Sequence, residues 1–302
     1  MNKQELSALV AEILQTMTPE PMVKGSEYKP ENPGPKAEDH HFHDGDFVPD
    51  VTKLDLRKLY LTADPEQKEA FAKLKARTPA RLGNGKAGAR YQTLTMLRFR
   101  ADHAAAQDAV FSQVPEDYAE KNSLLPLQTQ CQSKDEYLTR PDKGRVLDDE
   151  SARKLKSAIP NAPKVLIVIG DGLSSAAILA NAMDCMAAIR DGLKAKGIET
   201  GVSPFVRYCR VGAGDAIGDI TGCELVCMLV GERPGLVTDK SMSAYITYKP
   251  RTGVSESSRT VVSNIHAQGT PAVEAGAHIA SVIETILSKK VSGVGLHREA
   301  GA

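Results

Sequence analysis

Three short loops hold most of the residues in this sequence that could bind a ligand. They are 170–175, 210–215 and 231–236, and their glycines and other small residues let a bulky ligand approach the backbone closely. They carry carboxylates and fixed positive charges: Asp171, Asp215, Glu232, Arg210 and Arg233. These groups can bind a polar ligand but form no complete catalytic set, because the sequence has no Gly-x-Ser-x-Gly elbow, Cys–His arrangement or metal-binding helix.

Apolar runs in the second half of the chain predict the strands that position these loops. The runs are 164–170, 205–211, 224–230 and 243–248. The first is bounded by Pro163 and Gly170, which is typical of a strand buried on both faces. A long helix follows to Gly197, and another begins at Pro271. This alternation predicts an α/β fold with a doubly wound parallel sheet, where a ligand lies at the carboxyl ends of the strands.

Composition divides the chain into four segments. Residues 1–18 predict an amphipathic helix and residues 19–50 a flexible linker rich in proline and acids. Residues 51–150 predict a mostly helical domain, and the sheet domain occupies 151–302. A helix on such a tether has no neighbour to cover its apolar face, which favours docking on another protein. The alternative is that it folds back on its own domain.

Two charged segments each allow two interpretations. Acids surround His40, His41 and His43 in the loop 38–50, which could hold a metal. A loop interrupted by Gly and Pro fixes no ligand geometry, however, and this favours a solvated acidic loop. The stretch 73–100 carries eight basic residues and no acid, with a Gly-rich section suited to a phosphate. A basic patch facing an acidic partner subunit is at least as good an interpretation.

Composition also excludes several classes of protein. The 302 residues carry 38 basic and 38 acidic side chains, and this balance argues against a dedicated nucleic-acid binder. No apolar run approaches the ~20 residues needed to cross a bilayer. Five cysteines without a C-x-x-C pair indicate buried thiols in a reducing cytoplasm, not a disulfide scaffold or a zinc site.

Several ordered motifs resemble the light chain (small subunit) of adenosylcobalamin-dependent ethanolamine ammonia-lyase. They are RPDKGR at 140–145, IGDGLSS at 169–175, VGERPGL at 230–236 and SNIH at 263–266, supported by GKAG at 85–88 and LRFRADH at 97–103. The resemblance covers residues 77–295. Occurring together and in order, the motifs are far more specific than any one of them.

This resemblance implies a Rossmann-like sheet domain in an enzyme that converts ethanolamine to acetaldehyde and ammonia by radical chemistry. The large chain of such an enzyme carries the reaction, so this chain is expected to hold neither catalytic residues nor metal ligands. Adenosylcobalamin is gripped between the two chains, and the family's contacts correspond to Val211, Glu232 and Val261. Some relatives have Cys at position 261, so that contact persists here only if the backbone makes it. For Glu232 the alternative role is a salt bridge with Arg233 or another basic residue. For Val211 and Val261 the alternative is plain packing at a strand end.

The resemblance also predicts which group ligates the cobalt and what the first helix docks to. The Asp-x-His-x-x-Gly motif that supplies a cobalt ligand in some cobalamin proteins is absent, so the cofactor is expected base-on, with its own benzimidazole on cobalt. Helix 1–18 resembles peptides that load enzymes into bacterial microcompartments. The complex is therefore expected in the cytoplasm within such a shell, with no nucleic-acid or membrane partner.

Two alternative functions remain open. One is a free-standing protein that binds cobalamin or a nucleotide. The other is a nicotinamide-dependent oxidoreductase, which the sequence supports weakly because Gly170-Asp-Gly172 lacks the second half of the G-x-G-x-x-G fingerprint.

Overall fold

The computed structural model describes residues 50–51, 54–62 and 66–296. The expected targeting helix at 1–18, the linker at 19–50 apart from Asp50, and the three histidines near residue 40 lie outside the described residues. By its internal contacts the chain separates between Pro49 and Asp50, and all described residues belong to the second unit.

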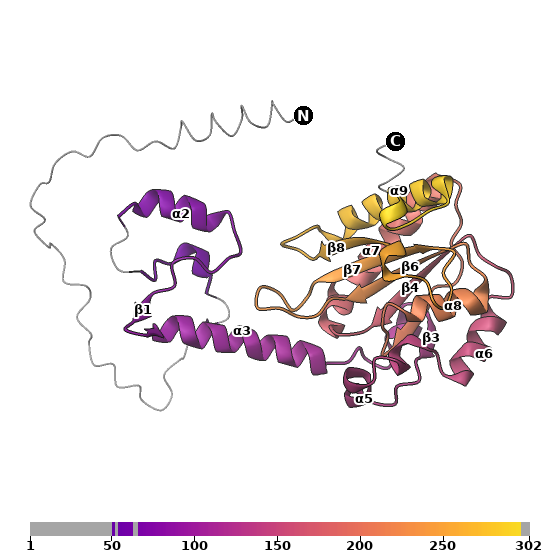
Figure 1. Ribbon diagram of the computed structural model, residues 1–302, viewed down its shortest axis with the longest axis horizontal. Helices are drawn as coiled ribbons and strands as arrows, with labels where there is room; N and C mark the ends of the chain where they lie inside the picture. Colours follow the sequence, from indigo (N-terminus) through magenta and orange to yellow (C-terminus); the bar gives the residue numbers. More distant parts are fainter. Residues whose placement is uncertain (1–49, 52–53, 63–65, 297–302) are drawn as a thin grey trace, which may run out of the picture. The chain divides into compact units, whose positions relative to one another are not determined.

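Six strands form the central sheet of an α/β fold (Figure 1). They are β3 (Leu125–Gln128), β4 (Val165–Asp171), β5 (Pro204–Arg207), β6 (Leu225–Gly231), β7 (Met242–Tyr248) and β8 (Arg259–Ile265). In the sheet order β3-β5-β4-β6-β7-β8, the first four strands are parallel. β7 is antiparallel to β6, and β8 is antiparallel to β7. The four expected strands correspond to β4, β5, β6 and β7, whereas β3 and β8 have no counterpart among the apolar runs.

The expectation of a wholly parallel sheet is wrong at β7. Parallel neighbours need a crossover, and α7 (Ser175–Ala195) and α8 (Ala213–Thr221) supply it between β4 and β5 and between β5 and β6. β6 and β7 are instead joined by residues 232–241, which form no helix, so the chain returns antiparallel. β3 also lies before residue 151, so the sheet is not confined to residues 151–302.

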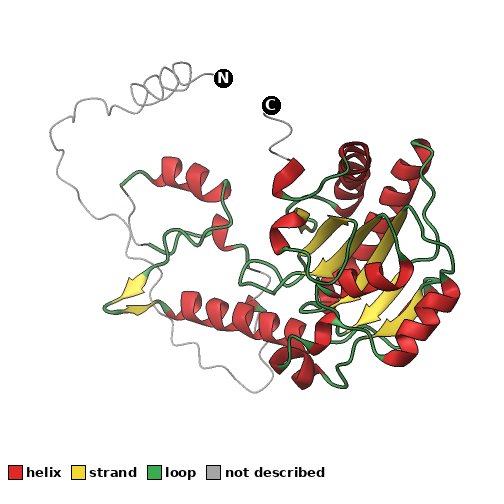
Figure 2. Cartoon of the chain, turned by 45° about the vertical axis from the view of Figure 1, so that its right-hand side comes forward, coloured by secondary structure: helices red, strands yellow, loops and turns green. Residues whose placement is uncertain are grey.

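Helices cover both faces of the sheet (Figure 2). α7 and α9 (Ala272–Lys289) pack against one face, and α6 (Asp149–Ala158) and α8 pack against the other. β4 contributes to both cores: Val165, Ile167 and Ile169 belong to the core with α7 and α9, while Leu166 and Val168 belong to the core with α6 and α8. The run at 164–170 is therefore a strand buried on both faces, as its sequence predicts.

Among the described residues before β3, the chain forms helices and one hairpin. α2 (Lys68–Ala76), preceded by the 3-10 turn η2 (Leu56–Lys58), and α3 (Thr93–Phe111) account for the helical character expected there. Between them, the Gly-rich basic stretch forms the antiparallel pair β1 (Lys86–Ala87) and β2 (Arg90–Tyr91). The remaining short elements are α4 (Tyr118–Lys121), α5 (Lys134–Thr139), η3 (Lys143–Arg145) and η4 (Glu256–Ser258).

All five cysteines are buried and free, which confirms the expectation of buried thiols. Burial raises the pKa of the Cys185 thiol to about 12, so this thiol stays protonated near neutral pH.

Candidate functional site

The three loops expected to bind a ligand meet at one edge of the sheet. β4, β5 and β6 run parallel, so their carboxyl ends lie side by side. The Cys209 N–H donates to the Asp171 carbonyl at 2.8 Å and ties the chain after β5 to the end of β4. A Cβ on Gly172 would lie 2.9 Å from the Cys209 carbonyl oxygen, and a Cβ on Gly231 would lie 2.2 Å from that of Ser174. These glycines therefore allow one loop to pack on another.

Asp171 is a buried structural carboxylate. It is 2% exposed and accepts the Ser175 hydroxyl at 2.6 Å and the Val114 N–H at 3.3 Å. Burial raises its pKa, and the hydrogen bond from Ser175 opposes that shift. Because its partners fasten the start of α7 and the chain after α3, Asp171 holds the loop together and does not face a ligand.

Asp215 forms a buried ion pair with Arg259. Nη1 and Nη2 of Arg259 donate to the two carboxylate oxygens at 2.9 and 2.7 Å, and the Arg259 side chain is 3% exposed. Arg259 also donates to Glu256 Oε2 at 2.7 Å, and hydrogen bonds to these carboxylates raise its pKa despite the burial. The pair joins the first turn of α8 to the first residue of β8.

The two arginines of the loops differ in role. Arg210 Nη2 donates to the Tyr137 carbonyl at 2.7 Å, and its guanidinium lies 4.7 Å from the centre of the Tyr137 ring. It therefore fastens its loop to α5. Arg233 is exposed and lines a cavity of about 340 Å³ together with His103 and Phe111 of α3.

Glu232 begins the loop after β6, and the neighbouring strands fix its position. Its N–H donates to the Ser241 carbonyl at 2.9 Å. Its Oε1 accepts the Ser243 hydroxyl and the Asn264 N–H, the latter at 3.0 Å. Within the described residues these bonds hold the carboxylate, in place of a salt bridge with Arg233 or another basic residue, and no hydrogen bond reaches Oε2.

Val261 lies on the same face of the sheet as the Glu232 carboxylate. It pairs with Tyr245 across β7 and β8 and is 46% exposed. Tyr245 packs against the core with α6 and α8, and Ser243 lies two residues before it, so both point to that face. Burial and the nearby charge of Glu232 raise the pKa of Tyr245, which agrees with their proximity.

Val211 is connected to this surface through α8. It directly precedes the residue that caps α8, and the first turn of this helix is bound to Arg259, two residues before Val261. Glu232 and Val261, far apart in sequence, therefore share one surface, and α8 connects Val211 to it. We name the surface around Glu232, Tyr245 and Val261 the open face.

Sequence reasoning missed two residues that shape the open face. Arg259 is buried, which its charge gave no reason to expect. Asn264 adopts a left-handed φ of 63° at a point where the register of β7 and β8 shifts. Asn tolerates this conformation better than most residues, so an Asn near a strand end was the available signal.

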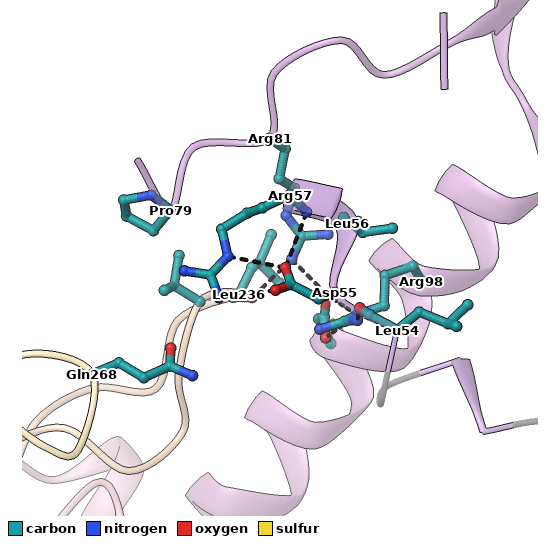
Figure 3. Close-up of a pocket in the computed structure, with 11 residues that line it drawn as sticks. Leu54, Asp55, Leu56, Arg57, Pro79, Arg81, Arg98, Leu236 and Gln268 are labelled. Atoms are coloured by element: carbon teal, nitrogen blue, oxygen red, sulfur yellow. Dashed lines mark hydrogen bonds and ion pairs between the residues drawn. The ribbon is translucent and has the colours of Figure 1, made fainter. Parts of the chain in front are cut away.

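The basic stretch contributes to a separate cavity beside the third loop (Figure 3). This cavity, of about 300 Å³, is lined by Arg81, Arg98 and Asp102 among others. Arg81 Nη2 donates to Asp102 at 2.6 Å and to the Leu236 carbonyl at 2.7 Å, and Arg98 Nε donates to the same carboxylate at 2.9 Å. Two basic residues of 73–100 thus have carboxylate partners within the chain, which weakens the phosphate interpretation for them.

In residues 50–51, 54–62 and 66–296, no three His, Cys, Asp or Glu side chains are grouped as a metal site would require. None of the helices in these same ranges combines the length and apolar character needed to cross a membrane.

Comparison with known proteins confirms the resemblance carried by the motifs. The family model described as ethanolamine ammonia-lyase light chain matches residues 68–297. The chain is 57% identical over 251 residues to the ethanolamine ammonia-lyase small subunit of Clostridium perfringens, covering 83% of this chain and 85% of that one. It is 52% identical over 298 residues to the corresponding subunit of Clostridioides difficile, covering 98% and 100%. It is 54% identical over 249 residues to the ethanolamine ammonia-lyase small subunit of Listeria monocytogenes, covering 82% of this chain and 85% of that one. The chain belongs to the ethanolamine ammonia-lyase light chain family.

Proposed function

We propose that this chain is the small subunit of an ethanolamine ammonia-lyase and that its open face holds adenosylcobalamin against the large chain. The complex would convert ethanolamine to acetaldehyde and ammonia. Family membership supports the subunit role. The observation that supports the cofactor role is that Glu232 and Val261, far apart in sequence, share one exposed surface of the sheet, to which α8 connects Val211.

The open face offers the chemistry that a corrin ring requires. The rim of a corrin carries primary amides, which donate to carboxylates and accept from N–H groups. Glu232 offers Oε2 as an acceptor while two donors fix Oε1. Exposed Val261 beside half-buried Tyr245 adds apolar surface. β8 is an edge strand, so backbone groups on its outer side are unpaired within the sheet, which suits a backbone contact at Val261.

The residues of this chain bind and orient the cofactor, and the large chain carries the reaction. The chemistry that adenosylcobalamin supplies when bound is radical generation through homolysis of its cobalt–carbon bond. Glu232 would fix the rotation of the ring by accepting from a rim amide. Val211 and Val261 would exclude water from the covered part of the ring. The absence of Asp-x-His-x-x-Gly from the sequence supports a base-on cofactor.

Expression of the chain with and without a large chain tests this function. Acetaldehyde release from ethanolamine and adenosylcobalamin is expected only from the pair. Release by this chain alone would contradict the subunit role. Stable cobalamin binding by this chain alone, with no activity from the pair, would favour a free-standing carrier.

The proposal extends to the cellular location. We propose that residues 1–18 dock the complex to the shell of a cytoplasmic microcompartment and that residues 19–50 act as the tether. The apolar residues Leu6, Leu9 and Ile13 at helical spacing support this role. Acetaldehyde is volatile and toxic, so confinement of its source is physically sensible.

A further inference from the structure

A bulge in β8 turns an additional side chain toward the open face. The register of β7 and β8 shifts around Ser243, so that Ser263 and Asn264 both stand opposite this one residue. Ser243 points to the open face, where its hydroxyl bonds Glu232. Both bulge residues are exposed. Asn264 therefore projects beside Glu232, whose carboxylate accepts the Asn264 N–H at 3.0 Å.

His266 determines which end of the Asn264 amide is free. The Gln268 N–H donates to His266 Nδ1 at 3.2 Å, so Nδ1 carries no proton and the proton of the neutral ring lies on Nε2. Nε2 lies 2.8 Å from Asn264 Oδ1 and is therefore the donor of that bond. The amide oxygen is occupied, and within the described residues no hydrogen bond uses Nδ2.

The loop that carries His266 is closed tightly, which keeps the amide in this orientation. The Thr270 N–H donates to the Asn264 carbonyl at 2.9 Å, and the His266 N–H donates to the Thr270 carbonyl at 3.1 Å. A Cβ on Gly269 would lie 2.6 Å from Asn264 Nδ2 and 2.8 Å from His266 Nε2, so only glycine leaves room for both groups. A left-handed conformation costs energy in a residue other than glycine and persists where its surroundings impose it.

We infer that Asn264 is a further cofactor-binding residue and that His266 is the residue that positions it. Asn264 Nδ2 donates to the oxygen of a rim carboxamide, while Glu232 Oε2 accepts from an amide nitrogen. This donor–acceptor pair favours primary amides over carboxylates, because a carboxylate would meet the negative charge of Glu232. The inference rests on the proposed function, since cobalamin is the ligand.

Equilibrium binding of cyanocobalamin to the assembled two-chain complex tests the role of Asn264 without turnover. Asn264→Gly keeps the left-handed backbone and the N–H to Glu232 and removes only the side chain. It should weaken binding about tenfold, as expected for the loss of one hydrogen bond to the ligand. Asn264→Asp keeps the shape and the bond from His266 but removes the donor, and it should weaken binding at least as much.

Asn161 provides the matched controls. It is exposed and precedes β4, at the opposite edge of the sheet from the open face. Asn161→Gly and Asn161→Asp repeat the same chemical changes and should leave cyanocobalamin binding unchanged. Asn264→Gly should also keep the melting midpoint of the complex, because glycine adopts a left-handed φ without strain.

His266→Ala separates positioning from a general structural role. It should weaken binding severalfold in the wild-type background and no further in the Asn264→Gly background, since His266 acts through Asn264. An equal loss in both backgrounds would contradict the positioning role.

The outcomes for this inference and for the proposed function are distinct. If the wild-type complex binds cyanocobalamin and Asn264→Gly binds it within about twofold, the inference is wrong and the proposed function stands. If the wild-type complex binds no cobalamin, the proposed function fails and the inference fails with it. Weaker binding in both Asn264 variants but not in the Asn161 variants supports the inference.

Discussion

Removing the guanidinium of Arg259 should destabilise the fold strongly. Arg259 Nη2 lies 2.7 Å from Asp215 Oδ2, and the two side chains are 3% and 11% exposed. Arg259→Ala leaves Asp215 buried without this partner, and breaking one side of a buried pair costs about 3–5 kcal/mol. With about 2–4 °C per kcal/mol for a unit of this size, the melting midpoint should fall by roughly 6–20 °C.

Arg140→Ala is the matched control for this experiment. Arg140 Nη2 also lies 2.7 Å from a carboxylate oxygen, Oδ2 of Asp142, but these side chains are 54% and 61% exposed. Solvent screens such a pair, so the midpoint should change little. Thermal unfolding of the assembled complex, followed by circular dichroism, measures both variants under the same conditions.

A double replacement separates the burial of charge from packing. Arg259→Met together with Asp215→Leu leaves no unpaired charge, so this variant should recover most of the stability that Arg259→Ala loses. A fall in the midpoint of less than about 2 °C for Arg259→Ala would refute the reasoning, because it would mean that Asp215 needs no charged partner.

Three other perturbations follow from particular contacts. Gly231→Ala should lower the free energy of unfolding by about 1–3 kcal/mol, because the added Cβ would lie 2.2 Å from the Ser174 carbonyl oxygen. The control is Gly235→Ala, whose Cβ meets open space and which should leave this free energy unchanged. Urea unfolding measures both variants. Burial raises the pKa of Asp171, so the folded protein holds this proton more tightly than the unfolded chain does. The stabilisation that the bound proton provides is fully present below the ordinary pKa of 3.8, and it is lost as the pH rises through the pKa of the folded state. The stability of Asp171→Asn relative to wild type should therefore increase over that range, and a flat difference would contradict this. Deleting residues 1–20 should preserve acetaldehyde release but free the complex from purified shells; loss of activity would indicate a structural role instead.

The strands that the sequence predicts best are those buried on both faces. Most of β4 and β6 consists of continuous apolar runs, 165–169 and 225–230, because successive side chains in these runs enter one core or the other. β3 and β8 are the two edge strands, and neither has such a run. β3 contains Pro126, which a central strand would not accept, and β8 is buried only at its two ends, Arg259 and Ile265. Edge strands carry weaker apolar signals, so pattern alone misses them.

The choice among candidate carboxylates was not accessible from the sequence. Asp171, Asp215 and Glu232 follow strand ends in the same way, and all three fit a polar ligand equally well. Asp215 is neutralised by Arg259, which lies 44 residues away along the chain. Only tertiary structure reveals such a partner. The motif resemblance points to Glu232 on other grounds and does not depend on how the aspartates are paired. Glu232 differs from the two aspartates in keeping one oxygen free of hydrogen bonds within the described residues.

The antiparallel return at β7 explains why the open face exists. A parallel strand in this position would need a crossover helix, which would cover one face of the sheet there. Because loops instead connect β6 to β7 and β7 to β8, α9 covers these strands on one side only. The other side is left exposed at Val261 and bordered by Glu232 and the start of α8. A ligand shared with a second chain requires a surface that the first chain leaves uncovered. The departure from the expected parallel topology therefore creates the surface that we propose holds the cofactor.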